Sequence, residues 1–460
     1  MKICVLGCGL RTPLLLHGMV HSEIGAHEIA LYDVDRSRAE LMTQIGAAIS
    51  TGKPITIRPA AEPESAIDGS DFVISSFRAG DMQARAADER LALECGFAGQ
   101  ETTGPAGFAM ALRTIPVALR YARMVERLAP RAWIVNFTNP AGLITQAIHN
   151  HTQARVVGIC DTPAELILQI ARALGVAHTD VHCDYVGLNH LGWVRSVKLR
   201  GEEMLGALLA DQALLRRLYP AELFESEHLT ALGMLPTEYV FFYYNQEKAR
   251  RNQSRTNATR GEELQRMNGE VWEHLHRHAQ TGNAGAALGA YRSYLNRRNA
   301  SYLKLEGAGE SAFDGAEPDW NPFEGETGYH RIAVQAIAAL SGPRSSSMIL
   351  NVPNRGCIEG LEPEDVVETT CMVSDAGAHP LAAGRLPAAV QGLVFSVKQY
   401  ERLTIEAAVE ESWEKAVLAL ATNPIVGNWE AARNFVSRLA KSNPAGFPLS
   451  REAPRQHSTA

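Results

Sequence analysis

The stretch Lys2-Ile3-Cys4-Val5-Leu6-Gly7-Cys8-Gly9-Leu10-Arg11-Thr12-Pro13 decides the fold of this chain. Its apolar residues are typical of a buried strand, and Gly7 and Gly9 mark a tight turn into a helix. A second strand over residues 28–32 ends at Asp33. The two glycines would let the backbone approach a pyrophosphate at the helix N-terminus, and Asp33 stands where a carboxylate binds a ribose hydroxyl.

This pattern predicts a dinucleotide site, although position 12 holds Thr instead of the third glycine of the usual fingerprint. The alternative is a tight strand–helix turn that binds nothing. Asp33 favours NAD over NADP because a carboxylate repels a 2′-phosphate, whereas Arg36 and Arg38 oppose that preference. We expect the cofactor to contact the turn and the nearby strand ends, at Gly7, Gly9, Leu10, Arg11, Thr12, Asp33, Phe77 and Asn136.

Composition excludes several classes of protein. The chain has 460 residues, a net charge of −7 and 46% hydrophobic residues, enough for two domains with filled cores. The mild acidity argues against a nucleic-acid partner, and no apolar run reaches the roughly 20 residues of a membrane span. Seven scattered cysteines and a strand at the N-terminus indicate a cytoplasmic protein with reduced thiols.

Strands and helices alternate through the first 182 residues, so we predict a Rossmann-like parallel sheet with helices on both faces. Helices then become longer and strands alternate in polarity, which predicts a larger α+β domain over residues 183–450 that binds substrate and metal and forms oligomers. Residues 451–460 are polar and expected to be disordered. The whole α/β architecture is similar to that of lactate and malate dehydrogenases.

Polar clusters follow several of the predicted strands and loops. Glu101 lies in Gly99-Gln100-Glu101-Thr102-Thr103-Gly104, and Asn139 lies in Asn136-Phe137-Thr138-Asn139-Pro140. Because ligands bind at the carboxyl ends of parallel strands, these groups indicate a polyhydroxylated substrate facing the cofactor.

Cys160 and His190 are candidate ligands of a divalent metal ion. Two protein ligands would leave positions for water or substrate oxygens. The alternatives are structural: Asp161 or Thr162 can cap a helix, and a lone histidine among apolar residues is usually a packing residue.

An aromatic band, Pro236-Thr237-Glu238-Tyr239-Val240-Phe241-Phe242-Tyr243-Tyr244, follows in the second half. Most of these rings are expected to pack at a domain junction. One tyrosine could act as a base if a cation or metal ion lowered its pKa from about 10.

The chain from Lys2 to about Val436 resembles the NAD- and metal-dependent glycosidases of glycoside hydrolase family 4, an exception to hydrolysis by two carboxylates. It is most similar to the 6-phospho-β-glucosidase branch. The motifs that carry the resemblance lie at residues 99–104, 111–116, 136–142, 351–356, 377–381 and 399–404.

The resemblance implies roles for particular residues. Tyr239 matches the catalytic base, and Asp161 matches a position that is an acid in the α-specific branch. The remaining matches are Cys160 and His190 for Mn²⁺ or another divalent metal, Glu101, Asn139 and Asn189 for the sugar, and Arg85 and Arg260 for the sugar and its 6-phosphate. Each arginine could equally be an ordinary salt-bridge residue.

The implied reaction oxidises the sugar at C3, removes the C2 proton, eliminates the C1 group, adds water and reduces the ring again. The implied substrate is a phosphorylated disaccharide or aryl glycoside, and the implied assembly is a homodimer or homotetramer. Open alternatives are a 6-phospho-α-glucosidase, a glycosidase acting on unphosphorylated sugars, a 2-hydroxyacid dehydrogenase and a non-catalytic NAD sensor. Tyr243 and Tyr244 remain alternatives to Tyr239 as the base.

Overall fold

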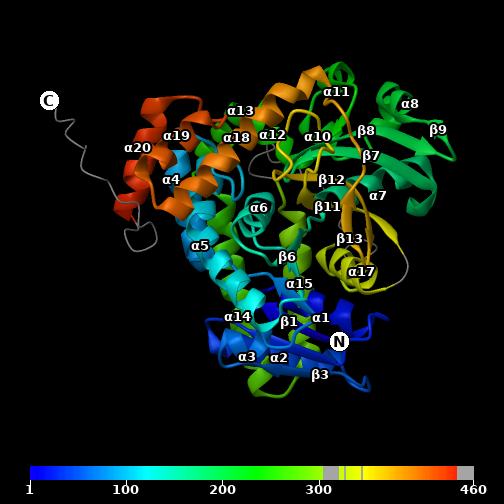
Figure 1. The fold of residues 1–460 in the computed structure, drawn as a ribbon, viewed down its shortest axis with the longest axis vertical. Coiled ribbons are helices and arrows are strands. Elements are labelled where there is room, and N and C mark those ends of the chain that lie inside the picture. The colour runs from blue at the N-terminus through cyan, green and yellow to red at the C-terminus, as the bar shows by residue number, and fades with distance from the viewer. Residues whose placement is uncertain (304–320, 326–327, 343–344, 443–460) are drawn as a thin grey trace.

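The computed structural model describes residues 1–303, 321–325, 328–342 and 345–442. Within them a thirteen-stranded sheet runs through the whole molecule in the order β10-β8-β7-β12-β11-β6-β5-β4-β1-β2-β3, with β13 beside β12 and β9 beside β8. Figure 1 shows β1 and β3 at the bottom of the view and β7 to β9 at the upper right. None of the helices in these ranges is long and apolar enough to cross a bilayer.

One half of the sheet is parallel, as the alternating sequence predicts. Its strands are β1 (Lys2–Leu6), β2 (Glu28–Tyr32), β3 (Thr56–Pro59), β4 (Phe72–Ser75), β5 (Trp133–Asn136) and β6 (Arg155–Gly158). The helices between them are α1 (Thr12–Val20), α2 (Arg36–Ile49), α3 (Pro63–Ile67), α4 (Asp81–Glu94), α5 (Gly104–Leu128), α6 (Ala141–His151) and α7 (Thr162–Leu174).

Side chains of these strands alternate between two hydrophobic cores because successive residues of a strand point to opposite faces. On β1, Ile3 and Val5 lie in one core, whereas Cys4 and Leu6 lie in the other. Both faces of the parallel sheet are therefore covered, which explains the nearly continuous apolar run in the sequence.

The other half of the sheet is antiparallel. It comprises β7 (Val181–Leu188), β8 (Leu191–Leu199), β9 (Glu202–Glu203), β10 (Leu235–Pro236), β11 (Ser346–Pro353), β12 (Val366–Ser374) and β13 (Gly377–Pro380). A single pair of residues, Asn351 on β11 and Gly158 on β6, joins it to the parallel half. The predicted division at residue 182 therefore crosses one continuous sheet, and it stays a prediction.

Helices of the second half cover this sheet and also pack against α4 and α5. The short ones are α8 (Leu205–Ala210), α9 (Gln212–Leu215), α10 (Pro220–Leu223), α11 (Ser226–Leu232), α12 (Phe241–Tyr244) and the 3₁₀ turns η1 (His178–Asp180) and η2 (Glu238–Val240). The longer ones are α13 (Gln246–Thr256), α14 (Arg260–Gln280), α15 (Ala284–Ala300), α17 (Tyr329–Ser341), α18 (Ala388–Glu410), α19 (Trp413–Thr422) and α20 (Trp429–Ser442).

The predicted α/β class with a Rossmann-like parallel sheet and an α+β second half is confirmed. Residues 203–218 of the second half contain the separate short helices α8 and α9. The longer helices α14 and α15 lie on either side of Gly282, which has φ +68°. A residue in that left-handed region ends an α-helix. The tail at 451–460, expected to be disordered, lies outside the described residues.

We predict that Gly158→Ala destabilises the junction between the two halves of the sheet. A Cβ at this position would collide with Thr145 Oγ1 and approach the Asn351 Cβ to 2.8 Å. Overpacking of this kind costs about 1–3 kcal/mol, so the urea midpoint of unfolding should fall.

The matched control is Gly269→Ala within α14, where no described atom lies within 4 Å of the added Cβ. Replacement of a helical glycine by alanine should leave the midpoint unchanged or raise it, by about 0.5–1 kcal/mol of stability. Equal midpoints for Gly158→Ala and the wild type would show that the junction tolerates the extra methyl group.

Candidate active site

The glycine turn after β1 has the geometry of a nucleotide-binding turn. Gly7 has φ +98°, and a Cβ there would lie 2.5 Å from the backbone of Phe77. Gly9 faces open space, because apart from its chain neighbours no described residue comes within 4 Å of the position that a Cβ would take. Asp33 accepts hydrogen bonds from the backbone N–H of Cys8 at 2.7 Å and of Asp35 at 2.9 Å. The turn therefore packs against Phe77 at Gly7, whereas the space beside Gly9 is open.

The two arginines that opposed an NAD preference both have acidic partners. Arg38 Nη2 lies 2.5 Å from Asp81 Oδ2, and Arg36 Nε lies 2.8 Å from Glu40 Oε1. Both arginines thus have partners within the protein, and the preference for NAD that Asp33 indicates stays a prediction.

A pocket lies next to this turn, and six of the predicted site residues line it. It is bounded by the glycine turn, the loop before α5, the residues after β5, η2 and the N-terminus of α14. The six residues are Arg11, Arg85, Glu101, Asn139, Tyr239 and Arg260. Elements far apart in the sequence therefore converge on one cavity, as expected at the carboxyl ends of parallel strands.

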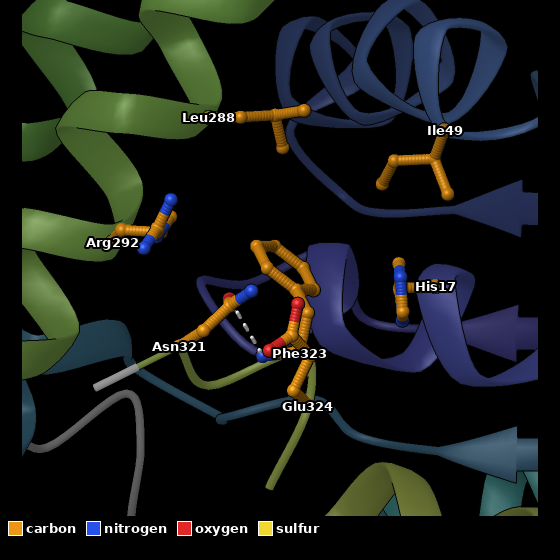
Figure 2. Close-up of a pocket in the computed structure, with 7 residues that line it drawn as sticks. All are labelled: His17, Ile49, Leu288, Arg292, Asn321, Phe323 and Glu324. Carbon is orange, nitrogen blue, oxygen red and sulfur yellow. Dashed lines mark hydrogen bonds between the residues drawn. The ribbon is translucent and has the colours of Figure 1, made fainter. Parts of the chain in front are cut away.

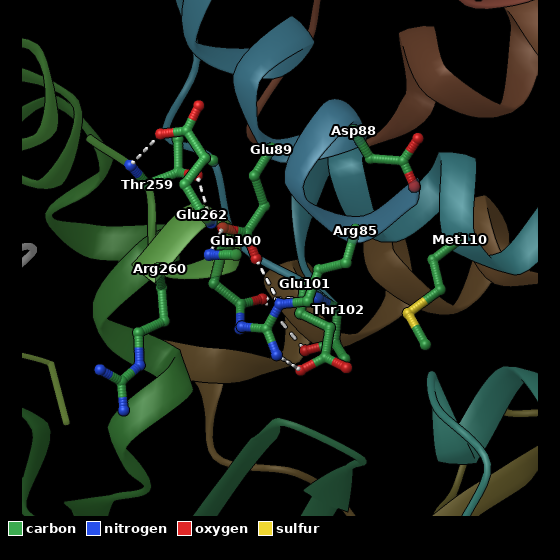
Figure 3. Close-up of polar contacts among 12 residues, drawn as sticks. Arg85, Asp88, Glu89, Gln100, Glu101, Thr102, Met110, Thr259, Arg260 and Glu262 are labelled. Atoms are coloured by element: carbon green, nitrogen blue, oxygen red, sulfur yellow. Dashed lines mark hydrogen bonds and ion pairs between the residues drawn. The ribbon is translucent and has the colours of Figure 1, made fainter. Parts of the chain in front are cut away.

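Arginines surround Glu101 at one wall of this pocket. Figure 3 shows Arg85 between Glu89 and Glu101: its Nε donates to Glu89 Oε1 at 2.8 Å, and its Nη1 lies 2.7 Å from Glu101 Oε2. Arg78 forms a second ion pair with Glu101. Burial opposes ionisation of Glu101, but these guanidinium charges outweigh it and hold its pKa below the usual range. Glu101 therefore presents a carboxylate to the cavity.

Arg260 stands at the start of α14, where Thr259 caps the helix. Its guanidinium donates to Ser301 Oγ at 2.6 Å and to the carbonyl of Arg298 at 2.8 Å. Arg298 lines the same pocket, and its charge lowers the pKa of Asp161 in opposition to the effect of burial. The pocket thus contains more positive charge than the sequence analysis assigned to it.

Cys160 and His190 lie beside the pocket. Cys160 Sγ is 3.6 Å from His190 Nε2, and the His190 ring stacks on Tyr239 with centroids 3.8 Å apart. Burial lowers the pKa of His190 to about 3 and raises the pKa of the Cys160 thiol well above its usual range.

This pair fits a divalent ion. A separation of 3.6 Å lets the sulfur and the nitrogen both reach one ion at bond lengths of about 2.0–2.3 Å. A neutral imidazole is already the ligating form, and a bound cation would favour the thiolate. Groups of three or more His, Cys, Asp or Glu do not occur around a common point in the described part of the chain. Such a two-ligand site would leave positions for substrate oxygens.

Tyr239 is hydrogen-bonded to a tyrosine that the sequence analysis did not name. Tyr302 OH donates to Tyr239 OH at 2.8 Å and lies 3.3 Å from Glu238 Oε1. Burial, reinforced by the charge of Glu238, raises the pKa of Tyr239 above its usual range. Ionisation of Tyr239 would therefore need a nearby cation, and the Cys160–His190 pair is the neighbour that could hold one.

Asp161 occupies the residue before α7 without capping it through its side chain. Burial raises the pKa of Asp161, while Arg11 and a hydrogen bond from Tyr329 oppose that rise. The Arg11 guanidinium in turn stacks on Tyr329 at 3.6 Å from the ring centroid. Arg11 therefore links the cofactor turn to Asp161.

Two predicted ligand residues have amides that bond within the protein. Asn136 donates to Thr145 Oγ1 at 3.1 Å and accepts from the backbone N–H of Thr138. Asn189 donates to Glu368 Oε1 at 2.9 Å and accepts from the backbone N–H of Gly142. Their roles toward cofactor and sugar stay predictions, because the side chains already have protein partners.

Sequence reasoning missed four residues at the site: Arg298, Tyr302, Tyr329 and Glu368. Arg298 lies near the C-terminal end of α15, Tyr302 lies just after this helix and Tyr329 begins α17, in segments without a motif quoted above. A glutamate inside the otherwise apolar and β-branched run of β12 was the available signal for Glu368.

A second cavity, of about 280 Å³, lies away from these residues (Figure 2). It opens between α1, α2 and α15, with His17, Ile49, Leu288, Arg292, Asn321, Phe323 and Glu324 at its walls. None of the predicted site residues lines it.

Comparison with known proteins identifies the class of this chain. A family model described as "Family 4 glycosyl hydrolase" matches residues 2–176, and one described as "Family 4 glycosyl hydrolase C-terminal domain" matches residues 185–426. The chain belongs to glycoside hydrolase family 4, as its motifs indicated.

Individual relatives differ in specificity. The chain is 30% identical over 466 residues to the "Probable 6-phospho-beta-glucosidase" of Bacillus subtilis strain 168, covering 97% of each protein. It is 26% identical over 465 residues to the phospho-alpha-glucosidase PagL of Clostridium acetobutylicum, covering 96% of this chain and 97% of the relative. Identities of 26–30% establish the family but do not decide whether the substrate is an α- or a β-glucoside.

Solved structures agree with the fold. The 6-phospho-beta glucosidase from Thermotoga maritima with manganese, NAD⁺ and glucose-6-phosphate has a TM-score of 0.80 at 26% identity, over 98% of this chain and 100% of that one. A lactate dehydrogenase from a deep-sea metagenome has a TM-score of 0.52 at 12% identity, over 89% of this chain and 98% of that one. The second likeness concerns the fold alone and confirms the predicted dehydrogenase-like architecture.

We predict that Glu238→Gln stabilises the protein at alkaline pH. Burial raises the pKa of Glu238 to about 7, so the folded protein holds this proton more tightly than the unfolded chain does. Stability is therefore lost as pH rises from the ordinary glutamate range through 7, by at most roughly 3 kcal/mol.

Urea midpoints of the wild type and Glu238→Gln, measured at pH 5 and pH 8, test this. The urea midpoint of Glu238→Gln, compared with that of the wild type, should be higher at pH 8 than at pH 5. The comparison isolates Glu238 because all other groups titrate alike in the two proteins. A difference between the two proteins that is the same at both pH values would contradict the prediction.

Proposed function

We propose that this protein hydrolyses 6-phospho-β-glucosides with NAD⁺ and Mn²⁺, or another divalent metal ion, as cofactors. The observation that carries the proposal is the convergence of the Cys160–His190 pair, Tyr239 and Glu101 beside an open glycine turn. The Thermotoga maritima structure, with manganese, NAD⁺ and glucose-6-phosphate, supports the choice of ligands.

When bound, NAD⁺ would supply reversible hydride transfer at the sugar and the metal ion would polarise the sugar oxygens. The chain supplies the rest. Tyr239 would take the proton from C2, because it stacks on a metal-binding imidazole and its hydroxyl oxygen accepts a hydrogen bond from Tyr302. Glu101 and Asn139 would accept and donate hydrogen bonds to the sugar hydroxyls.

The arginines support a phosphorylated substrate. Arg85, Arg260 and Arg298 line the pocket, and guanidinium groups are suited to phosphate oxygens. Arg85 has two carboxylate partners and Arg260 has several oxygen partners, so Arg298 holds the charge that is best placed for a new ligand.

A 6-phospho-α-glucosidase is the second candidate function, and Asp161 favours it. This carboxyl group is buried, its pKa is raised, and its position matches the acid of the α-specific branch. The higher identity to the Bacillus subtilis relative favours the β anomer.

We also propose, from the family resemblance alone, that the protein forms a homodimer or homotetramer. All seven cysteines are free thiols, which supports the cytoplasm as its location.

The test of specificity uses four matched aryl glucosides: α and β, each with and without the 6-phosphate. We expect turnover of the 6-phospho-β substrate only, its loss on chelation and its return with Mn²⁺. NADH should not accumulate, because the hydride returns to the sugar. Preferential turnover of the α substrate would favour the second candidate, and steady NADH accumulation would indicate a simple dehydrogenase.

We predict that Tyr239→Phe lowers kcat by about 10²–10⁴-fold, the usual contribution of a positioned base. Tyr243→Phe is the control, because Tyr243 is also mostly buried but is not among the residues that line the pocket. Its kcat should stay within a few-fold of the wild type. Full activity of Tyr239→Phe would transfer the role of base to a neighbouring tyrosine.

A further inference from the structure

The threonine after Glu101 bonds directly to the imidazole of His190. Thr102 Oγ1 lies 2.6 Å from His190 Nδ1 and 3.0 Å from the side-chain oxygen of Gln100. Neither Thr102 nor Gln100 has a role in the proposed function. Both lie in the loop that precedes α5, whereas His190 lies in the turn between β7 and β8.

The direction of these hydrogen bonds follows from Gln100. Its Oε1 accepts from the backbone N–H of Thr102 at 2.7 Å and of Thr103 at 2.8 Å, so this atom is the carbonyl oxygen of the amide. The Thr102 hydroxyl donates its only proton to this carbonyl oxygen at 3.0 Å. In that arrangement the hydroxyl oxygen is available to accept a hydrogen bond from His190.

A hydrogen-bond acceptor at Nδ1 favours the tautomer of His190 that carries its proton on Nδ1. In this tautomer the lone pair of Nε2 faces Cys160 Sγ at 3.6 Å. Stacking on Tyr239, at an interplanar angle of 16°, holds the plane of the ring. The backbone of His190 has φ +64°, a left-handed conformation that sets where the side chain leaves the turn.

We infer that Gln100 and Thr102 are positioning residues that prepare His190 Nε2 as a metal ligand. This inference rests on the proposed function, since it assumes that the Cys160–His190 pair holds the ion. Partners of this kind fix the tautomer and orientation of a ligating histidine, and their loss typically lowers metal affinity by about 10–100-fold.

The test compares Thr102→Val, which keeps the shape of the side chain and removes the hydroxyl, with Thr102→Ser, which keeps the hydroxyl. Thr114→Val is the matched control, because the buried Thr114 hydroxyl on α5 has no hydrogen-bond partner among the described residues. Mn²⁺ binding is followed by the electron paramagnetic resonance of the free ion. NAD⁺ binding is measured by calorimetry as a check of folding.

We expect Thr102→Val to bind Mn²⁺ about 10–100-fold more weakly, with Thr102→Ser and Thr114→Val close to the wild type and NAD⁺ affinity unchanged in all of them. Equal Mn²⁺ affinity of Thr102→Val and the wild type would overturn the inference. So would an equal loss of Mn²⁺ affinity in Thr102→Val and Thr102→Ser.

A second measurement separates this inference from the proposed function. Nitrogen-15 NMR of histidine-labelled protein without metal, with His190 assigned from a His190→Gln variant, reports which ring nitrogen carries the proton. We expect the proton on Nδ1 in the wild type and a change of tautomer population in Thr102→Val. A proton on Nε2 in the wild type would overturn the inference. Failure of the wild type to bind Mn²⁺ would instead count against the proposed function.

Discussion

The buried carboxylate of Glu368 connects the candidate site to the sheet through hydrogen bonds. Glu368 on β12 accepts hydrogen bonds from Tyr185 on β7 at 2.7 Å and from Asn351 on β11 at 2.9 Å. It also accepts from Asn189, the residue before His190. Asn351 pairs with Gly158, two residues before Cys160. The same carboxylate thus joins the segments that end at Cys160 and His190, and three donors offset the cost of its burial.

Burial of the charged side chains around Glu101 also costs desolvation free energy, but these side chains orient the polar groups of the pocket. Buried ion pairs contribute little net stability, because desolvation cancels much of their attraction. Glu101 and Glu89 on one side and Arg78 and Arg85 on the other nevertheless fix one arrangement of polar groups at the pocket wall. In the proposed function, an entering sugar would meet oriented donors and acceptors, so less reorganisation would be needed when it binds.

Sequence patterns predicted the features that depend on residues close together in the chain. The strand, the glycine turn and Asp33 follow from spacing, and motifs brought Cys160, His190 and Tyr239 together as candidates. Patterns did not reveal Tyr302, because its partner Tyr239 lies 63 residues away in the sequence. They did not reveal Glu368 either, because its partners Asn351 and Tyr185 lie 17 and 183 residues away. For Asn136 and Asn189 the pattern indicated a ligand, yet the amides bond to nearby protein groups, because an amide at a strand end can satisfy either.

A shared fold does not fix the chemistry at its strand ends. The lactate dehydrogenase likeness extends over 89% of this chain at 12% identity, so the sheet and its helices alone do not decide the reaction. On the antiparallel half of the sheet, the turn between β7 and β8 brings His190 to Cys160, and η2 places Tyr239 against the His190 ring. In the proposed function, these residues would present a metal ion and a tyrosine base to the same sugar. Oxidation of the sugar would then serve bond cleavage, because Arg11 of the glycine turn and Tyr239 line one pocket.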